Sequence, residues 1–308
     1  MRWTHTRAVW TMVAAAAMWS IAGVVTRMLE SVQSFELTFW RSFFTAICLV
    51  VFLRVLQGPG VLQRLVKAPK QLWLSGMSWA VMFTAFMVAL TLASVAEVLV
   101  TMSVGPLLTA LVARIFYKQT IQLPTWIAIV IAGGGMFWMY AEPQAITSTT
   151  NAFTLAGLPW GTLIGFLVPT AAAVNWCVVQ QAQKTGDSLD LLPAVLVGAV
   201  ISGMLTFVLA WPLHSSPHDI AWLALLGLVQ LAMPCTLLVF CARILSAPEI
   251  SLLSLLEVLF GIFLAWIGAG EEPSARVISG GALVIVALVV NAYGMKRKSL
   301  EEKSHERV

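Results

Sequence analysis

Ten long apolar segments, separated by short connections, are the feature that most restricts how this chain can fold. A helix of about 20 apolar residues is long enough to span the hydrocarbon core of a bilayer. Because backbone polar groups inside lipid must be bonded within their own segment, such runs predict helices. The expected spans are residues 8–29, 35–56, 70–91, 95–117, 122–140, 160–181, 189–211, 219–241, 247–268 and 274–294.

The composition is typical of an integral membrane protein. Charged residues make up only 10% of the chain, and hydrophobic residues make up 59%. Soluble globular domains carry about 25% charged residues, so that class is excluded. The net charge of +4 does not indicate a nucleic-acid partner, because the basic residues lie in short loops and at the two ends. We therefore predict an all-α integral membrane protein in contact with the lipid bilayer.

Lysine and arginine predict how the chain is oriented. With the N-terminus inside, fifteen of the eighteen Lys and Arg residues fall on the inner side, and only Arg27, Arg41 and Arg276 fall outside. Since positively charged loops stay in the cytoplasm, we expect both termini on the cytoplasmic side. We expect the protein to span the inner (plasma) membrane of the cell. The N-terminal stretch has no Ala-x-Ala cleavage signal, which predicts that the first span is retained.

The two halves of the chain match each other at an offset of 152 residues. This offset places Ala96-Glu97-Val98 over Pro248-Glu249-Ile250, and Leu111-Val112-Ala113 over Phe263-Leu264-Ala265. Each half has five spans, an odd number, so the second copy is inserted upside down. Inverted repeats that meet around a site at the membrane midplane are a recurrent design of secondary transporters.

The same pattern predicts the domain organisation. The charged C-terminal tail has a composition that favours disorder. The expected parts are a first repeat at 1–141, an outer polar linker at 142–159, a second repeat at 160–295 and a charged cytoplasmic tail at 296–308.

Motifs in both halves carry a resemblance to a known family. The fourth span contains Thr91-Leu-Ala-Ser-Val-Ala-Glu-Val-Leu and Val104-Gly-Pro-Leu-Leu-Thr-Ala-Leu, and the ninth contains Ala247-Pro-Glu-Ile-Ser-Leu-Leu-Ser-Leu-Leu-Glu-Val-Leu-Phe. Ala17-Met-Trp-Ser and Phe39-Trp-Arg-Ser stand in the first two spans. Together these motifs resemble the EamA-type members of the drug/metabolite transporter (DMT) superfamily, which have ten spans in two five-span repeats.

The chain departs from that family at three motifs. It has Trp19-Ser20, Lys118-Gln119 and Leu256-Glu257-Val258 where the family has Trp-Gly, Gly-Glu and Leu-Glu-Pro. Without the proline, the family's helix break at position 258 is not predicted in the ninth span. Gly105-Pro106 keeps a break in the paired fourth span.

Glu257 is the strongest candidate for a functional side chain. It lies about ten residues into the ninth span, near the midplane, where a lone carboxylate costs at least ~2.5–3.5 kcal/mol. Ser251 and Ser254 share its helix face at spacings of six and three residues. In the functional interpretation, Glu257 lies in a cavity and binds a cationic group or exchanges a coupling proton. In the structural interpretation, Glu257 is protonated and forms a hydrogen bond with a neighbouring helix.

The fourth span carries a polar stripe that faces the same way. Thr101 and Gly105 follow Glu97 at intervals of four residues. Pro106 would loosen the backbone next to Gly105 and free carbonyl groups that can line a cavity. The alternative is close helix packing through small residues.

Arg41 and Glu97 lie at similar depths near the outer ends of their spans. An ion pair between them would close the outer side as a gating or structural pair. Alternatively, Arg41 extends its guanidinium to the lipid headgroups.

Six further side chains within spans are candidates for substrate binding. Indole rings near mid-span can wall an apolar cavity or pack in the core, and polar side chains can bind substrate or another helix. These residues are Trp19, its neighbour Ser20, Trp79, Asn175, Gln180 and Gln230.

Several functional classes have no support in the sequence. There is no Gly-rich phosphate loop, the four histidines lie in loops or at the ends, and the four cysteines show no paired spacing. We therefore predict no ATP hydrolysis, metal site, cofactor or enzymatic activity.

The expected function is that of a secondary transporter with alternating access around a midplane cavity. We expect it to export a small organic metabolite, an amino acid or an amphipathic drug-like compound. The family resemblance implies that spans 1, 3, 4, 6, 8 and 9 line the cavity. A transporter-like receptor or scaffold without transport activity is the alternative, and the sequence carries no signal of the oligomeric state.

Overall fold

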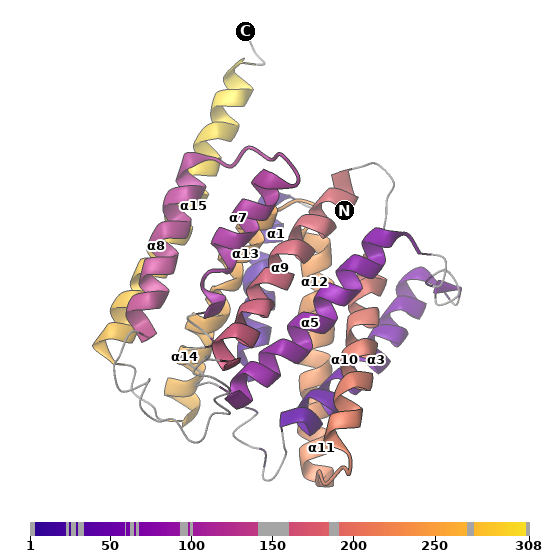
Figure 1. Ribbon diagram of the computed structural model, residues 1–308. Helices are drawn as coiled ribbons and strands as arrows, with labels where there is room; N and C mark the ends of the chain where they lie inside the picture. The colour runs from indigo at the N-terminus through magenta and orange to yellow at the C-terminus, as the bar shows by residue number, and fades with distance from the viewer. Residues whose placement is uncertain are drawn as a thin grey trace.

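The computed structural model describes residues 4–22, 34–58, 68–92, 101–140, 160–184, 191–269 and 274–305, together with Val25, Leu29, Gly60, Val61, Leu65 and Val98. These residues form a bundle of long helices, and no β-strand occurs among them (Figure 1). The helices of the first half are α1 (His5–Ser20), α3 (Ser34–Gln57), α5 (Lys70–Leu92), α7 (Gly105–Ile115) and α8 (Leu123–Tyr140).

The second half repeats this order with two interrupted spans. The eighth span changes from α- to π-helix and back, and the ninth is broken in its middle. The elements are α9 (Trp160–Lys184), α10 (Leu192–Ala210), α11 (Pro217–Leu225), η2 (Leu226–Ala232), α12 (Met233–Cys241), α13 (Ala247–Ser254), α14 (Leu256–Ala269) and α15 (Ala275–His305).

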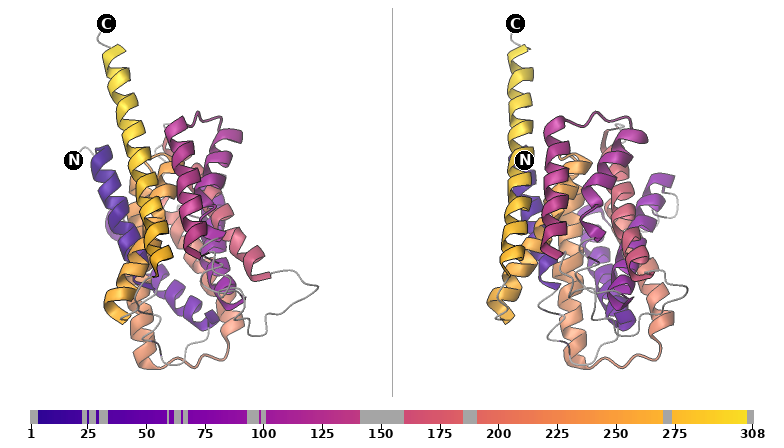
Figure 2. Two further views of the ribbon diagram at one scale, coloured as in Figure 1. Left: turned by 90° about the vertical axis from the view of Figure 1, so that its left-hand side faces the viewer. Right: turned by 60° about the vertical axis from the view of Figure 1, so that its left-hand side comes forward.

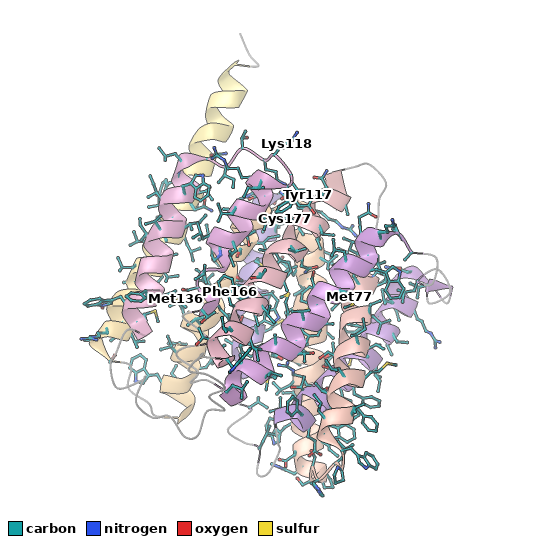
Figure 3. All side chains as sticks on the ribbon, viewed as in Figure 1. Met77, Tyr117, Lys118, Met136, Phe166 and Cys177 are labelled. Carbon is teal, nitrogen blue, oxygen red and sulfur yellow. The ribbon has the colours of Figure 1, made fainter. Side chains whose placement is uncertain are left out.

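The length and surface of the helices suit a bilayer. Among the described residues, seven helical stretches are long and apolar enough to cross a membrane, and Gly105–Ile115 and Leu123–Met139 are shorter apolar helices. Carbon-rich side chains cover the outside of the bundle, among them the exposed Met77 and Phe166 (Figure 3). An apolar surface of this extent suits contact with lipid.

Helix packing follows the inverted repeat. The third span, α5, packs on the sixth, α9, and their counterparts, α12 of the eighth span and α1, pack on each other. Helices at equivalent positions also pair, because α3 lies on α10 and α8 lies on α15 (Figure 1). The fold is therefore the predicted all-α membrane fold of ten transmembrane helices in two inverted five-helix repeats.

The ninth span is interrupted at Leu255, which separates α13 from α14. The Leu255 N–H donates to the Leu252 carbonyl at 3.1 Å, and the Val258 N–H donates to the Leu255 carbonyl at 3.2 Å. These three-residue bonds replace the four-residue bonds of an α-helix. The break therefore exists without the proline that the sequence comparison required, and Glu257 falls in the first turn of α14.

The charged tail also differs from expectation. Residues 296–305 continue α15 as helix, although their composition favours disorder. Lysine, arginine, leucine and glutamate all have high helix propensity, so the helix can extend beyond its apolar part. Both chain ends lie toward the same end of the bundle (Figures 1 and 2), which we refer to as the terminal end.

Candidate functional site

A cavity of about 150 Å³ lies at the centre of the bundle between helices of both repeats. Residues of α1, α5, α7, α9, η2, α12, α13 and α14 line it, as the family resemblance implied. The second and fifth spans contribute as well, through Arg41 and Met136. The site is thus enclosed by more spans than expected.

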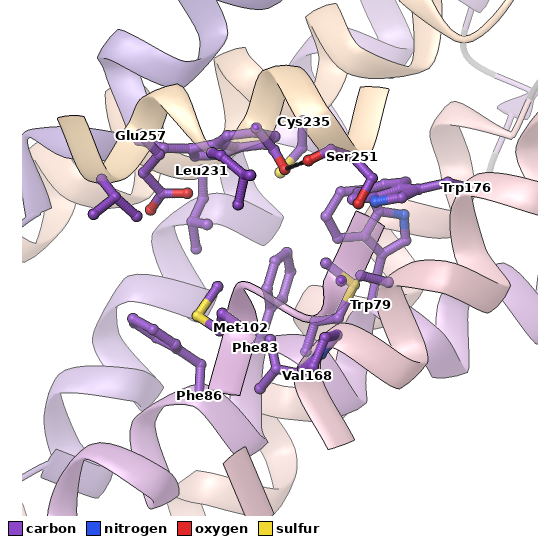
Figure 4. Close-up of a pocket in the computed structure, with 18 of the residues that line it drawn as sticks. Trp79, Phe83, Phe86, Met102, Val168, Trp176, Leu231, Cys235, Ser251 and Glu257 are labelled. Atoms are coloured by element: carbon purple, nitrogen blue, oxygen red, sulfur yellow. Dashed lines mark hydrogen bonds between the residues drawn. The ribbon is translucent and has the colours of Figure 1, made fainter. Parts of the chain in front are cut away.

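The ninth span supplies a polar wall. Ser251, Ser254 and Glu257 all line the cavity, and the Glu257 carboxyl group points into it (Figure 4). The Ser254 hydroxyl donates to the Ser251 carbonyl at 2.7 Å, within the turn where α13 ends. These three polar side chains, which stand on both sides of the break at Leu255, therefore share one wall of the cavity.

Arg41 lies in the same cavity and is only 3% exposed. Glu257 lines the same cavity, but the two side chains do not form an ion pair within 4 Å in the described part of the chain. The Arg41 Nε is buried and has no hydrogen-bond partner. A buried donor without a partner costs free energy, and a solute that bonds the Arg41 guanidinium from the cavity would remove part of that cost.

The helix that carries Arg41 is held close to the eighth span. The Thr45 hydroxyl donates to the Arg41 carbonyl at 2.7 Å and lies 3.0 Å from the Gly227 carbonyl. A Cβ at Gly227 would lie 2.7 Å from the Phe44 Cβ and 2.9 Å from the Arg41 carbonyl oxygen. Only glycine allows this approach, which fixes the backbone around Arg41.

Opposite the polar wall lies an aromatic and apolar one. Phe83, Phe86 and Met102 lie across the cavity from Glu257, and Trp79 and Trp176 lie at one end (Figure 4). The rings of Trp79 and Trp176 meet edge to face at 5.4 Å between centroids, a favourable aromatic geometry. The cavity therefore offers charge on one side and apolar surface on the other.

The π-helix η2 places Gln230 in the cavity wall. Pro234 has no N–H to bond the Gln230 carbonyl, and the Met233 N–H reaches back five residues to Leu228 instead. The Gln230 Oε1 is buried without a hydrogen-bond partner. Wide turns of this kind occur often at functional sites.

Four of the predicted site residues lie outside the cavity lining. Ser20 donates to the Ala17 carbonyl, and Asn175 accepts a 2.6 Å bond from the Ser75 hydroxyl. Gln180 accepts bonds from the Gln119 side chain and the Ala247 backbone, and Thr101 is buried beside the cavity. Glu97, the expected partner of Arg41, lies outside the described residues.

By contrast, the other predicted site residues that the structure describes all line the cavity: Trp19, Trp79, Gly105, Pro106, Gln230, Ser251, Ser254, Glu257 and Arg41. The sequence reasoning missed most of the apolar lining, such as Met82, Phe83, Phe86 and Trp176. An apolar residue in an apolar span carries no signal for the helix face it occupies. Only the mid-span position of Trp176 in α9 could have pointed to it.

The sequence of the chain matches a known family of membrane proteins. The sequence profile of the EamA-like transporter family matches residues 6–141 and, a second time, residues 159–293. The chain belongs to the EamA-like transporter family. Each of the two matches covers one repeat, so this EamA-like protein is a multi-pass membrane transporter.

The fold has a close counterpart among solved structures. A structure titled only "Crystal structure of protein" matches with a TM-score of 0.72, covering 96% of this chain and 99% of that chain. The sequence identity is 16%, so this likeness supports the fold alone. Comparison with curated proteins gives no match.

Proposed function

We propose that this EamA-like transporter carries a small zwitterion with an apolar body, such as an apolar amino acid. The observation that carries the proposal is the presence of Arg41 and Glu257 in one cavity without a direct ion pair between them. The two groups offer one positive and one negative binding partner to the same solute.

The charge balance favours a zwitterion over a simple ion. Guanidinium groups bind carboxylates with two parallel hydrogen bonds, and a carboxylate binds an ammonium group. An anionic solute would leave Glu257 without a partner, and a cationic solute would leave Arg41 without one. Because an uncompensated buried charge is strongly destabilising, a solute that carries both charges satisfies the cavity best.

The size and surface of the cavity limit the rest of the solute. A cavity of about 150 Å³ accommodates a molecule the size of benzene. Phe83, Phe86 and Met102 provide an apolar surface across from Glu257. An amino acid with a medium-sized apolar side chain fits this volume better than a larger drug-like compound.

We further propose alternating access in the inner membrane, with export of the solute and with both termini in the cytoplasm. The charge distribution along the sequence supports this orientation. At the terminal end, His5 bonds Glu249 at 2.8 Å, and Gln180 joins Gln119 to the start of α13. These bonds connect the two repeats and would close the cavity from the cytoplasmic side. Proton exchange at Glu257 is our hypothesis for the coupling.

A matched set of ligands tests the zwitterion directly. We would measure the binding of norleucine, N-acetylnorleucine and pentylamine to the purified full-length protein by calorimetry. The first compound has both charges, and the others lack the positive and the negative charge, respectively. We expect norleucine to bind, and we expect the other two to bind at least about tenfold more weakly.

Two variants assign each charge to its partner. Glu257→Gln should reduce the preference for norleucine over N-acetylnorleucine, and Arg41→Gln should reduce its preference over pentylamine. Equal binding of all three compounds to the wild-type protein would refute the proposal. Solute flux in liposomes then separates a transporter from a receptor or scaffold, which would bind but not move norleucine.

A further inference from the structure

We propose a second polar subsite in the cavity, at the end away from Glu257. There, the indole N–H of Trp79 donates a hydrogen bond to an acceptor atom in the distal part of the substrate side chain. The inference rests on the proposed function and adds a substrate class to it. The preferred amino acids carry an ether, carbonyl or hydroxyl oxygen near the end of an otherwise apolar side chain.

The first observation is an unpartnered donor in a buried residue. Trp79 is 1% exposed, and its Nε1 has no hydrogen-bond partner. An indole N–H can only donate, so it needs an acceptor. Trp79 lines the cavity, so a solute that packs against its ring and reaches the buried N–H would remove the cost of the unpaired donor.

The second observation is that the ring of Trp79 is fixed in place. A Cβ at Gly198 of α10 would lie 2.3 Å from the Trp79 Cβ, so glycine at this position lets α5 and α10 meet there. The indole ring also contacts Trp176 and Phe83, with centroids 5.4 Å away in both cases. A ring packed between two other aromatic rings, on a helix held close to its neighbour, loses little entropy on binding.

The third observation is the distance from Glu257. Ser251, which lies at the Trp79 and Trp176 end of the cavity, precedes Glu257 by six residues, or about 9 Å along a helix (Figure 4). The amino and carboxyl groups of one amino acid are too close together to reach both ends. The side chain therefore has to cross the apolar wall toward Trp79, and its terminal atoms meet the indole N–H.

The test compares two amino acids of nearly the same shape. O-methylhomoserine has the side chain of norleucine with one methylene replaced by an ether oxygen, which accepts a hydrogen bond and donates none. We would measure Kd for both compounds with the wild-type protein, with Trp79→Phe and with Trp73→Phe. Trp79→Phe keeps an aromatic ring and removes the donor, and Trp73 is an exposed tryptophan of the same helix outside the cavity.

We expect the ratio of the two Kd values to shift by about fivefold toward norleucine in Trp79→Phe and to stay unchanged in Trp73→Phe. A ratio that is the same in all three proteins overturns the inference and leaves the zwitterion proposal in place. Absence of binding for both amino acids in the wild-type protein overturns the proposed function itself. If Trp79→Phe does not fold, the wild-type ratio decides. A clear preference for norleucine over the ether then refutes the subsite, and a preference for the ether supports it.

Discussion

Ser103 and Leu255 occupy equivalent positions in the two repeats, 152 residues apart, and the helix is interrupted at both. Ser103 and Val104 form a turn before α7, and Leu255 separates α13 from α14. Both new helices therefore begin in the cavity wall, at Gly105 and next to Glu257. Because helix N-termini carry partial positive charge, the pair of breaks makes the centre of the membrane favourable for an anionic group.

The break predicts that a proline is tolerated at position 258. Val258 is the counterpart of Pro106 and lies in the first turn of α14, where proline would remove only the 3.2 Å bond from the Val258 N–H to the Leu255 carbonyl, a net loss of about 1 kcal/mol. We expect Val258→Pro to change the free energy of unfolding by no more than about 1 kcal/mol. Ile262→Pro, one turn deeper, should cost about 3 kcal/mol or more. Thermal unfolding in detergent measures both, and similar losses in the two variants would contradict the break at Leu255.

The architecture was predictable because the hydropathy and charge of the sequence determine where the spans lie and how they are oriented. Lipid forces each span to close its own backbone bonds, so apolar runs reveal the helices, and the offset between the repeats reveals the inverted topology. The break at Leu255 was not predictable, because no proline or glycine marks it. Its counterpart was predictable from Gly105-Pro106.

The candidate site was predictable only where a polar residue stands out in an apolar span. Glu257 drew attention for that reason, and Ser251 and Ser254 followed from helical spacing. The same rule could not separate Gln230, which lines the cavity, from Asn175, which bonds Ser75. Periodicity gives the face of a helix but not the neighbour that this face meets.

Gly227 offers a test of the packing that holds Arg41. An added Cβ would lie 2.9 Å from the Thr45 N and from the Arg41 carbonyl oxygen, so α3 and η2 would have to separate. We expect Gly227→Ala to destabilise the protein by about 1–3 kcal/mol and to weaken norleucine binding. Gly133→Ala is the control, because a Cβ at Gly133 meets no atom within 4 Å. A melting temperature for Gly227→Ala equal to that of the control would argue against the close approach.

Gly105 offers the opposite case, a substitution that alters the cavity without straining the fold. A Cβ at Gly105 would lie 3.6 Å from the Pro169 Cβ and from the Ser251 Oγ, which is ordinary contact. We expect Gly105→Ala to retain its melting temperature and to bind norleucine about tenfold more weakly, because the methyl group occupies space in the cavity. Alanine, with its short side chain, should bind with little change. Equal losses for both amino acids would show that Gly105 does not limit the size of the substrate.

The bond between His5 and Glu249 predicts how the cavity is closed at the terminal end. His5→Ala removes this link between α1 and α13, and we expect the cavity to open more often toward the cytoplasm. Cys235 lines the cavity, so in a variant without Cys48, Cys177 and Cys241 it reports access. Labelling of Cys235 by a membrane-impermeant thiol reagent in inside-out vesicles should become several-fold faster.

His218→Ala is the matched control for this experiment. His218 is similarly exposed, but it contacts Trp222 of its own helix. Its removal should leave the labelling rate of Cys235 unchanged. Equal rates in the wild-type protein and His5→Ala would mean that the bond between His5 and Glu249 does not hold the cavity closed.

The central claim is that Glu257 binds the ammonium group of the substrate inside the cavity. A measurement of transport tests this claim most directly. We would measure norleucine exchange in proteoliposomes across a range of pH, with the wild-type protein and with Glu257→Gln. The account predicts exchange by the wild-type protein and at least about a tenfold loss of rate in the variant, because the ammonium group loses its partner. The wild-type rate should depend on pH and the residual rate should not. A variant that moves norleucine at the wild-type rate, with the same pH dependence, would contradict the account.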